Sequence, residues 1–178
     1  MGASVPRACR SWAIDRDADD RFDPHQGPPL GRGRKRGAHK QAIGRSRGGR
    51  NTKIHALADA KGRLLSILLS GGEKHDCPPA QRLIRRIKAA KKLLGDKAYD
   101  SAELRQWLHQ RGTRPVVPNR SNRKQPFSFD RKAYKLRHRI ENAFGRLKDF
   151  RRIATRYDKL ARNFLAAVCL AAAIVWWT

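Results

Sequence analysis

Two apolar runs separated by three turn residues constrain the fold of this chain more than any other feature. Residues 53–59 read KIHALAD and residues 63–70 read RLLSILLS, with Ala60, Lys61 and Gly62 between them. Both runs have the length of a strand, and glycine can take the positive φ that a tight hairpin turn requires. The sequence therefore predicts a β-hairpin over residues 53–70.

Helices and short strands are expected to alternate after this hairpin. Pro78 and Pro79 suit the first turn of a helix, because proline has a fixed φ and lacks an N–H donor. The elements expected are a helix through Ile84 and Ile87 to about Leu93, a short buried strand over 93–95, a helix over 102–110, an edge strand at best over 115–118, a helix from about Asp130 and a closing helix over 163–177.

Neither end of the chain predicts a membrane or an export signal. The N-terminus contains no apolar run that resembles a signal peptide. The apolar run 164–177 would span about 21 Å as a helix, which is short of a bilayer core of about 30 Å, so a buried terminal helix is expected. Cys9, Cys77 and Cys169 are too widely spaced for a disulfide framework or a CxxC metal site. A cytoplasmic protein is expected.

Positive charge dominates the composition. The chain has 41 Lys and Arg against 15 Asp and Glu, which gives a formal net charge of +26. Such a charge opposes compaction unless a polyanion shares the space, so DNA or RNA is the expected partner. A membrane surface is the competing polyanion, but the cations are spread along the chain instead of lying on one amphipathic segment.

A helical stripe between Tyr134 and Lys148 sets one carboxylate among cations. At 100° per residue, with Tyr134 at zero, Arg137, Lys148 and Glu141 fall at about 300°, 320° and 340°. A surface helix with an i,i+4 ion pair between Arg137 and Glu141 is the alternative that residue types alone favour. The adjacent apolar stripe, which would dock the helix on a core, contains Leu136, Ile140, Ala143, Phe144 and Leu147.

A second carboxylate, Asp96, follows the short strand over 93–95. The end of such a strand is where an α/β sheet exposes a ligand to its cleft, although an Asp turn or helix cap is the alternative. Phosphoryl transfer on DNA requires carboxylates from separate elements to hold Mg²⁺ ions. Asp96 and Glu141 together would meet part of that requirement on a basic chain.

Tyr134, Arg137, Glu141 and Lys148 also match a family signature. At these spacings the chain resembles the DDE transposases of bacterial insertion sequences, in the branch with the signature Y-(2)-R-(3)-E-(6)-K. Further likenesses, which together cover residues 38 to about 175, are GRSRGG at 44–49 followed by TKIHA at 52–56, GG at 71–72 with HD at 75–76, DKAY at 96–99 and FRRIATRYDK at 150–159.

The resemblance implies an α/β fold of the RNase H type, a mixed sheet flanked by helices. It implies strand cleavage by water and strand transfer by the freed 3′-hydroxyl, both dependent on Mg²⁺ or Mn²⁺. Asp96 and Glu141 would be the second and third metal-binding acids. The partners would be transposon-end and target DNA on the bacterial nucleoid, with no membrane partner. The protein would act as a homo-oligomer in the DNA complex. Residues expected to contact DNA are Tyr134, Arg137, Lys148, Lys97, Arg45 and Arg47.

The family's first acid lies in a segment like I-D-S-T-x-x-x-A-H, and this segment has no clear counterpart here. Asp15 is a candidate for that acid, but Arg16 and Asp17 follow it instead of Ser and Thr. Residues 20–37 can be encoded by permitted codons that, read one base later, give I-D-S-T-R-I-K-A-H. This pattern favours a frame change near residues 35–37, either by a −1 ribosomal slip or by decay of the element.

Two regions are therefore expected. Residues 1–37 would be a disordered or frame-shifted basic arm, and residues 38–178 would be a partial catalytic domain. The first strand of the sheet would be missing or non-native, which would leave the hairpin 53–70 with an exposed edge. A catalytically inactive DNA-binding remnant, or an inhibitor of the full-length transposase, is the alternative to an active enzyme.

Overall fold

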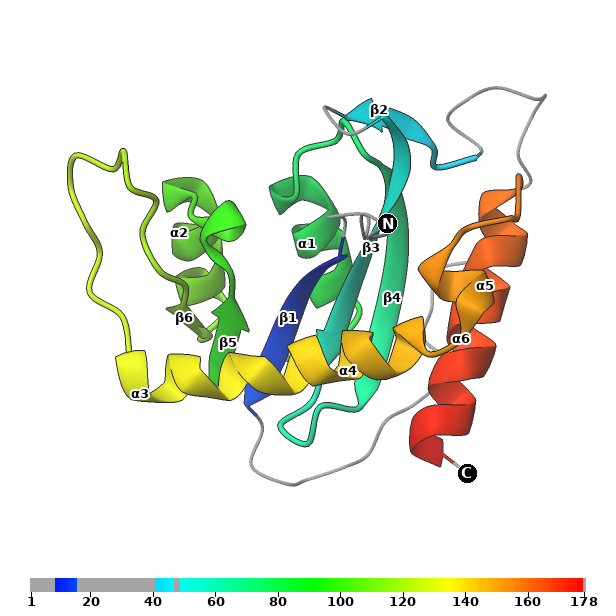
Figure 1. Cartoon of the computed structure of the whole chain (residues 1–178). Coiled ribbons are helices and arrows are strands. Elements are labelled where there is room, and N and C mark those ends of the chain that lie inside the picture. Colours follow the sequence, from blue (N-terminus) through cyan, green and yellow to red (C-terminus); the bar gives the residue numbers. More distant parts are fainter. Residues whose placement is uncertain (1–8, 16–40, 47–48, 178) are drawn as a thin grey trace.

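A mixed β-sheet forms the centre of the protein (Figure 1). The computed structural model describes residues 9–15, 41–46 and 49–177 of the chain. The strands are β1 Cys9–Asp15, β2 Gly44–Ser46, β3 Gly49–Ala58, β4 Leu64–Gly71, β5 Lys92–Gly95 and β6 Arg114–Val116.

The sheet combines parallel and antiparallel pairs. Strand β3 is antiparallel to β4 and to the short β2, and it is parallel to β1. On its other side β1 runs antiparallel to β5, which is parallel to β6. This arrangement confirms the mixed α/β class that the sequence predicts, whereas the RNase H-like arrangement stays a prediction.

Helices cover both faces of the sheet. Alternate residues of β3 enter different cores, as the two-residue period of a strand requires. Ile54 packs in one core with the α4 residue Phe144, and Leu57 packs in the other with the α1 residue Leu83. The helices are α1 Cys77–Ile84, α2 Ala102–Gln110, α3 Arg131–Tyr134, α4 His138–Lys148, α5 Arg151–Ala154 and α6 Ala161–Trp177, with the 3₁₀ helices η2 Lys97–Tyr99 and η3 Lys135–Arg137.

The predicted hairpin is confirmed as β3 and β4. Its turn is held by Asp59, whose Oδ1 accepts hydrogen bonds from the backbone N–H groups of Lys61 and Arg63, each at 2.9 Å. Gly62 has a φ of +85°. An added Cβ there would lie 3.2 Å from the Arg139 carbonyl oxygen of α4. Glycine therefore serves both the turn and the close approach of α4.

The helix predicted from about Asp130 is broken by a 3₁₀ turn. Asp130 caps α3, but η3 separates α3 from α4 and changes the angle between successive side chains. Leu136, which the sequence places on the apolar stripe, lies in this turn and is 36% exposed. The other members of the predicted stripe, Ile140, Ala143, Phe144 and Leu147, are buried.

The first strand of the sheet differs from the expectation. Residues 9–15 of the expected arm form β1, which pairs with both β3 and β5. A first strand is therefore not missing, and the expected exposed edge of the hairpin beside it is wrong, whereas the alternative that this strand is non-native stays a prediction. A sheet with a vacant central position would leave two rows of backbone groups unpaired, and β1 satisfies them. The remaining residues of the arm, 1–8 and 16–37, lie outside the described residues.

The other expected elements need smaller corrections. Helix α2 has the predicted bounds and β5 the predicted position, and β6 is an edge strand. Helix α1 ends at Ile84 instead of about Leu93, because the chain turns after Ile84 before β5 begins at Lys92.

The terminal helix α6 is only half buried. Phe164, Val168, Ala171 and Ala172 face the core, whereas Leu170 is 66% exposed. None of the helices in the described ranges is both long and apolar enough to cross a membrane.

The Gly62→Ala variant should lose about 1–2 kcal/mol of unfolding free energy, because a side chain at positive φ is strained. Gly145→Ala, in an open position on α4, should stabilise the protein by about 0.5–1 kcal/mol through the better helix propensity of alanine. Urea denaturation followed by circular dichroism measures both changes. Equal effects of the two substitutions would contradict the role assigned to Gly62.

Candidate functional site

The helical stripe is assembled by contacts within α3, η3 and α4. Arg137 donates a hydrogen bond to Glu141 Oε1, and its guanidinium lies 5.7 Å from the centroid of the Tyr134 ring. The Glu141 side chain is 54% exposed and that of Arg137 is 21% exposed. Lys148 is exposed in the last turn of α4, about 10 Å along the axis from Glu141 at about 1.5 Å per residue. Three members of the stripe thus touch, and the fourth lies two turns away.

Asp130 fixes the start of this helical region against the sheet. Its Oδ1 accepts a hydrogen bond from the Ala133 N–H at 2.9 Å, and its Oδ2 lies 3.2 Å from Lys92 Nζ at the start of β5. The Ala133 amide, followed by the Lys92 ammonium, lowers the pKa of Asp130 below its ordinary value. The cap therefore carries its charge at neutral pH and ties α3 to β5.

Asp96 stands where β5 ends and η2 begins. It is half buried, and its Oδ1 accepts a hydrogen bond from the Ala98 N–H at 2.7 Å. The N-cap that the sequence offered as an alternative is therefore present. Capping occupies one carboxylate oxygen with a single N–H, so it is compatible with a ligand at the other oxygen. The neighbouring Lys97 is exposed.

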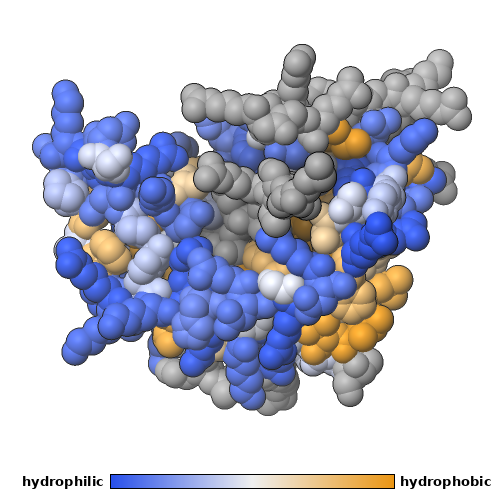
Figure 2. Space-filling model, in the orientation of Figure 1, coloured by the Kyte–Doolittle hydropathy of each residue, from blue (hydrophilic) through white to orange (hydrophobic). Residues whose placement is uncertain are grey.

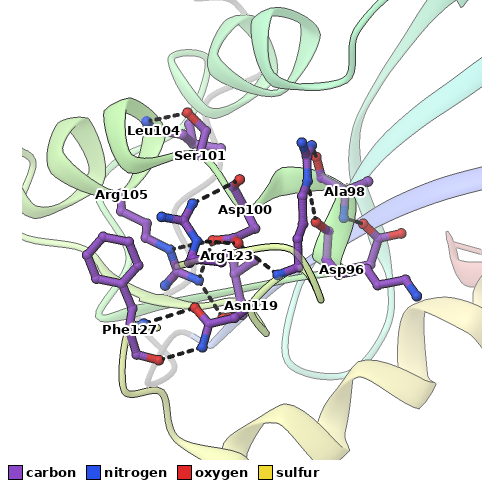
Figure 3. Close-up of polar contacts among 12 residues, drawn as sticks. Asp96, Ala98, Asp100, Ser101, Leu104, Arg105, Asn119, Arg123 and Phe127 are labelled. Carbon is purple, nitrogen blue, oxygen red and sulfur yellow. Dashed lines mark hydrogen bonds and ion pairs between the residues drawn. The ribbon is translucent and has the colours of Figure 1, made fainter. Parts of the chain in front are cut away.

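Asp100, four residues after Asp96, is the centre of a buried polar cluster (Figure 3). Its side chain is fully buried, and Oδ1 accepts from Arg105 Nε at 3.1 Å and from Arg105 Nη2 at 3.0 Å. Its Oδ2 accepts from the backbone N–H of Arg120 at 2.8 Å and from Arg123 Nε at 2.6 Å. One carboxylate thus connects η2, α2 and the loop 119–125.

Charge and hydrogen bonding decide the ionisation of Asp100. Burial favours the neutral acid, but the hydrogen bonds from Arg123, the Arg120 amide and Arg105 outweigh it. The net effect lowers the pKa of Asp100 below its ordinary value. A buried anion therefore offsets part of the positive charge of Arg105 and Arg123 at neutral pH.

Phe127 closes the cluster on its outer side. The guanidinium carbons of Arg105 and Arg123 lie 4.7 and 4.8 Å from the centroid of its ring. Asn119 holds the backbone of Phe127 through a pair of hydrogen bonds. The Phe127 N–H donates to Asn119 Oδ1 at 3.0 Å, and Asn119 Nδ2 donates to the Phe127 carbonyl at 2.8 Å. The aromatic ring and the paired amide bonds restrain the loop that carries Arg120 and Arg123.

A row of hydrogen-bonded polar side chains lies next to η2, the turn that follows Asp96. His55 Nε2 is 2.8 Å from Ser70 Oγ, and His55 Nδ1 is 3.5 Å from the Tyr99 hydroxyl. His55 and Tyr99 are both fully buried. Tyr99 is the last residue of η2, so this row of side chains connects η2 to strands β3 and β4.

Sequence inspection missed the role of Asp100. Acids are scarce in this chain, and a loop with Arg120, Arg123 and Lys124 needs a counter-charge to pack, which singles out Asp100 as well as Asp96 and Glu141. That signal was available in the sequence. The particular arginines that pair with Asp100 were not, since Arg123 lies 23 residues away from it.

The candidate first acid is not near Asp96. In the register of β1 with β5, Asp15 is opposite Lys92, whereas Trp12 is opposite Gly95, the residue before Asp96. Asp15 and Asp96 thus lie at opposite ends of β5, about 13 Å apart along the strand at about 3.3 Å per residue. Arg45 lies in β2, where only its backbone is described, and Arg47 lies outside the described residues.

The described parts of the chain contain no group of three or more His, Cys, Asp or Glu residues that could hold a metal ion. Asp96 and Glu141 offer carboxylate oxygens, the donors that Mg²⁺ prefers. Those residues alone therefore do not make a complete metal site.

Comparisons with known proteins agree on one family. A family model described as a transposase DDE domain matches residues 15–176. A Brucella ovis protein named as a transposase for the insertion sequence element IS6501 is 37% identical over 127 residues, which cover 70% of this chain and 97% of that protein.

Two longer relatives match over a smaller share of their length. Transposases for IS1106 of Neisseria meningitidis and IS402 of Burkholderia cepacia are each 28% identical to the chain, over 128 and 137 residues. The matches cover 66% and 71% of this chain, but only 44% and 63% of those proteins. No solved structure matches the chain significantly.

Asp100→Asn should destabilise the protein by about 3 kcal/mol or more, because it leaves buried arginines without their counter-charge. Since the folded-state pKa lies below the ordinary 3.8, the ionised carboxylate stabilises the fold above that pH. This stabilisation is lost as the pH falls through the lowered pKa. Urea denaturation between pH 2 and 7 tests this, with the exposed Asp149→Asn as control, for which a change of less than about 0.5 kcal/mol is expected.

Proposed function

Because the chain belongs to the DDE transposase family of insertion sequences, we propose that it is a transposase fragment that binds transposon-end DNA. Asp96 and Glu141 are assigned as two of the acids for Mg²⁺- or Mn²⁺-dependent strand cleavage and strand transfer. The observation that carries the proposal is the contact of Tyr134, Arg137 and Glu141 on one exposed helical face. Target DNA and further copies of the chain are the proposed partners in the complex, on the bacterial nucleoid.

The DNA-binding surface is assigned to the outer side of α3, η3, α4 and α5. Figure 2 displays a largely hydrophilic face over α4. Arg137, positioned by Tyr134, and Lys148 at the end of α4 would contact phosphates, and Lys97, Arg45 and Arg47 would extend this contact. Other exposed cations on these helices are Arg131, Lys132, Lys135, Arg146, Arg151 and Arg152.

A second candidate function is DNA binding without cleavage, as a remnant or an inhibitor of an intact transposase. Two observations favour it for this chain. The register of β1 separates Asp15 from Asp96, and the family match begins only at Asp15, the last residue of β1. The central strand is therefore made almost entirely of residues outside the family match. Of the proposed activities, DNA binding is the one that the geometry supports best.

Cleavage is tested with duplexes that carry the ends of the gene's own element, in Mg²⁺ or Mn²⁺. An active chain should nick them, and Asp96→Ala or Glu141→Ala should remove that activity, whereas the exposed Asp149→Ala should retain it. Nicking that survives both of the first substitutions would refute the assigned acids. Salt-dependent DNA binding by the parent chain with no nicking at any metal concentration would favour the second candidate.

DNA binding without metal gives a sharper test of the helical face. Glu141→Gln should bind duplex DNA several-fold more tightly, because it weakens the hydrogen bond that holds Arg137 and removes a charge that repels phosphate. Lys148→Ala should weaken binding and reduce the salt slope by about one. Fluorescence anisotropy at several salt concentrations measures both, with Arg82→Ala on α1 as a matched loss of exposed charge. If Arg82→Ala weakens binding as much as Lys148→Ala, the binding is diffuse and the assigned face is wrong.

The frame proposal is tested by the nucleotide sequence of the gene. It should encode I-D-S-T in the frame one base later than the codons of residues 20–37, a segment that lies outside the described residues. An in-frame stop upstream of that motif would favour decay of the element over ribosomal slippage. A gene that lacks I-D-S-T in the alternative frame would rule out a frame change.

A further inference from the structure

One planar peptide group connects Asp96 to the loop 119–125. The Ala98 N–H that donates to Asp96 Oδ1 at 2.7 Å and the Lys97 carbonyl belong to the same peptide unit. Arg120 Nε donates to that Lys97 carbonyl at 3.2 Å. Because the peptide unit is rigid and planar, a group that holds its C=O also orients its N–H.

Arg120 holds the next peptide group as well. Its Nη2 donates to the Ala98 carbonyl at 2.8 Å, so one guanidinium bridges two successive carbonyls of the turn. A rotation of the Lys97–Ala98 peptide would point its carbonyl oxygen at the Asp96 carboxylate and would break the Arg120 hydrogen bond. The arginine therefore opposes the rotation that would release Asp96 from its cap.

The backbone of Arg120 is itself anchored to the end of the same turn. Its N–H donates to the buried Asp100 Oδ2 at 2.8 Å. The contacts form a closed loop that runs from Asp100 through the main chain of Arg120 to its guanidinium, and back to Lys97 and Ala98. An exposed arginine is thereby held in place by a buried carboxylate.

We propose that Arg120 is a positioning residue, which fixes the Asp96 carboxylate through the Lys97–Ala98 peptide and leaves Oδ2 of Asp96 available for a ligand. Among the described residues, Ala98 is the partner that the structure gives to the Asp96 carboxylate. The functional meaning of this positioning rests on the proposed role of Asp96 as a metal-binding acid. The geometry itself does not depend on that role.

Hydrogen exchange of the Ala98 amide, measured by NMR, tests the positioning directly. Arg120→Ala should accelerate it by about tenfold or more, as expected for loss of a charge-assisted hydrogen bond. Arg120→Lys should restore part of the protection, because an ammonium can hold one carbonyl but cannot bridge two. The core amide of Leu94 should exchange at the parent rate in both variants, which excludes a general loss of stability.

A matched control lies in the same loop. Lys124→Ala removes an exposed cation that donates to neither carbonyl of the turn. It should change Ala98 exchange by less than about twofold. Acceleration by Lys124→Ala equal to that of Arg120→Ala, or no acceleration by Arg120→Ala, would overturn the proposal.

A double-mutant cycle separates positioning from a purely local effect. Asp96→Ala, which removes the acceptor, should accelerate Ala98 exchange in the parent chain and should add little in the Arg120→Ala background, because both substitutions break the same connection. Additive effects would overturn the proposal.

Mn²⁺-induced broadening of the Lys97 and Ala98 amides provides a separate test of the proposed function. If broadening is absent from the parent chain, the metal role of Asp96 fails, while the exchange result still decides the role of Arg120. Broadening that is present in the parent chain should decrease in Arg120→Ala and persist in Lys124→Ala.

Discussion

The buried carboxylate of Asp100 makes the packing of a strongly basic chain possible on one side of the sheet. Arg105 and Arg123 approach each other there because both bond to this one anion and both lie over the ring of Phe127. Without the carboxylate, two guanidinium groups would be placed close together in a poorly solvated region. The loop 119–125 would then have no anchor, and the turn that carries Asp96 would lose its outer support.

Some of the positive charge in this protein is therefore structural. Arg156 illustrates the same use of arginine near the C-terminus, where it donates to Thr52 and to the carbonyl oxygens of Gln41 and Ala42, and lies over the Phe164 ring. Such arginines connect segments that are distant in sequence, because one guanidinium offers five donors in a rigid plane. The count of 41 Lys and Arg consequently overstates the number of cations that are free to contact a polyanionic partner.

The two candidate acids depend on different parts of the fold. Asp96 is set by β5 and by the Asp100 cluster, whereas Glu141 is carried by α4, which crosses the sheet and packs against β1 (Figure 1). Strand β1 therefore affects both candidate acids. Its register with β5 places Asp15 at the end of β5 remote from Asp96, and β1 itself provides part of the surface on which the helix with Glu141 rests.

The sequence by itself determined the local elements and the residue stripe on the helix. The hairpin with Gly62, the bounds of α2, the helix start at Asp130 and the contact of Arg137 with Glu141 all follow from short-range rules of periodicity, turn chemistry and i,i+4 spacing. Only the tertiary structure decided the place and direction of β1, the exposure of Leu136 and the pairing of Asp100 with arginines of a distant loop. Strand direction and buried ion pairs depend on which remote segments meet, and no local pattern in the chain specifies that.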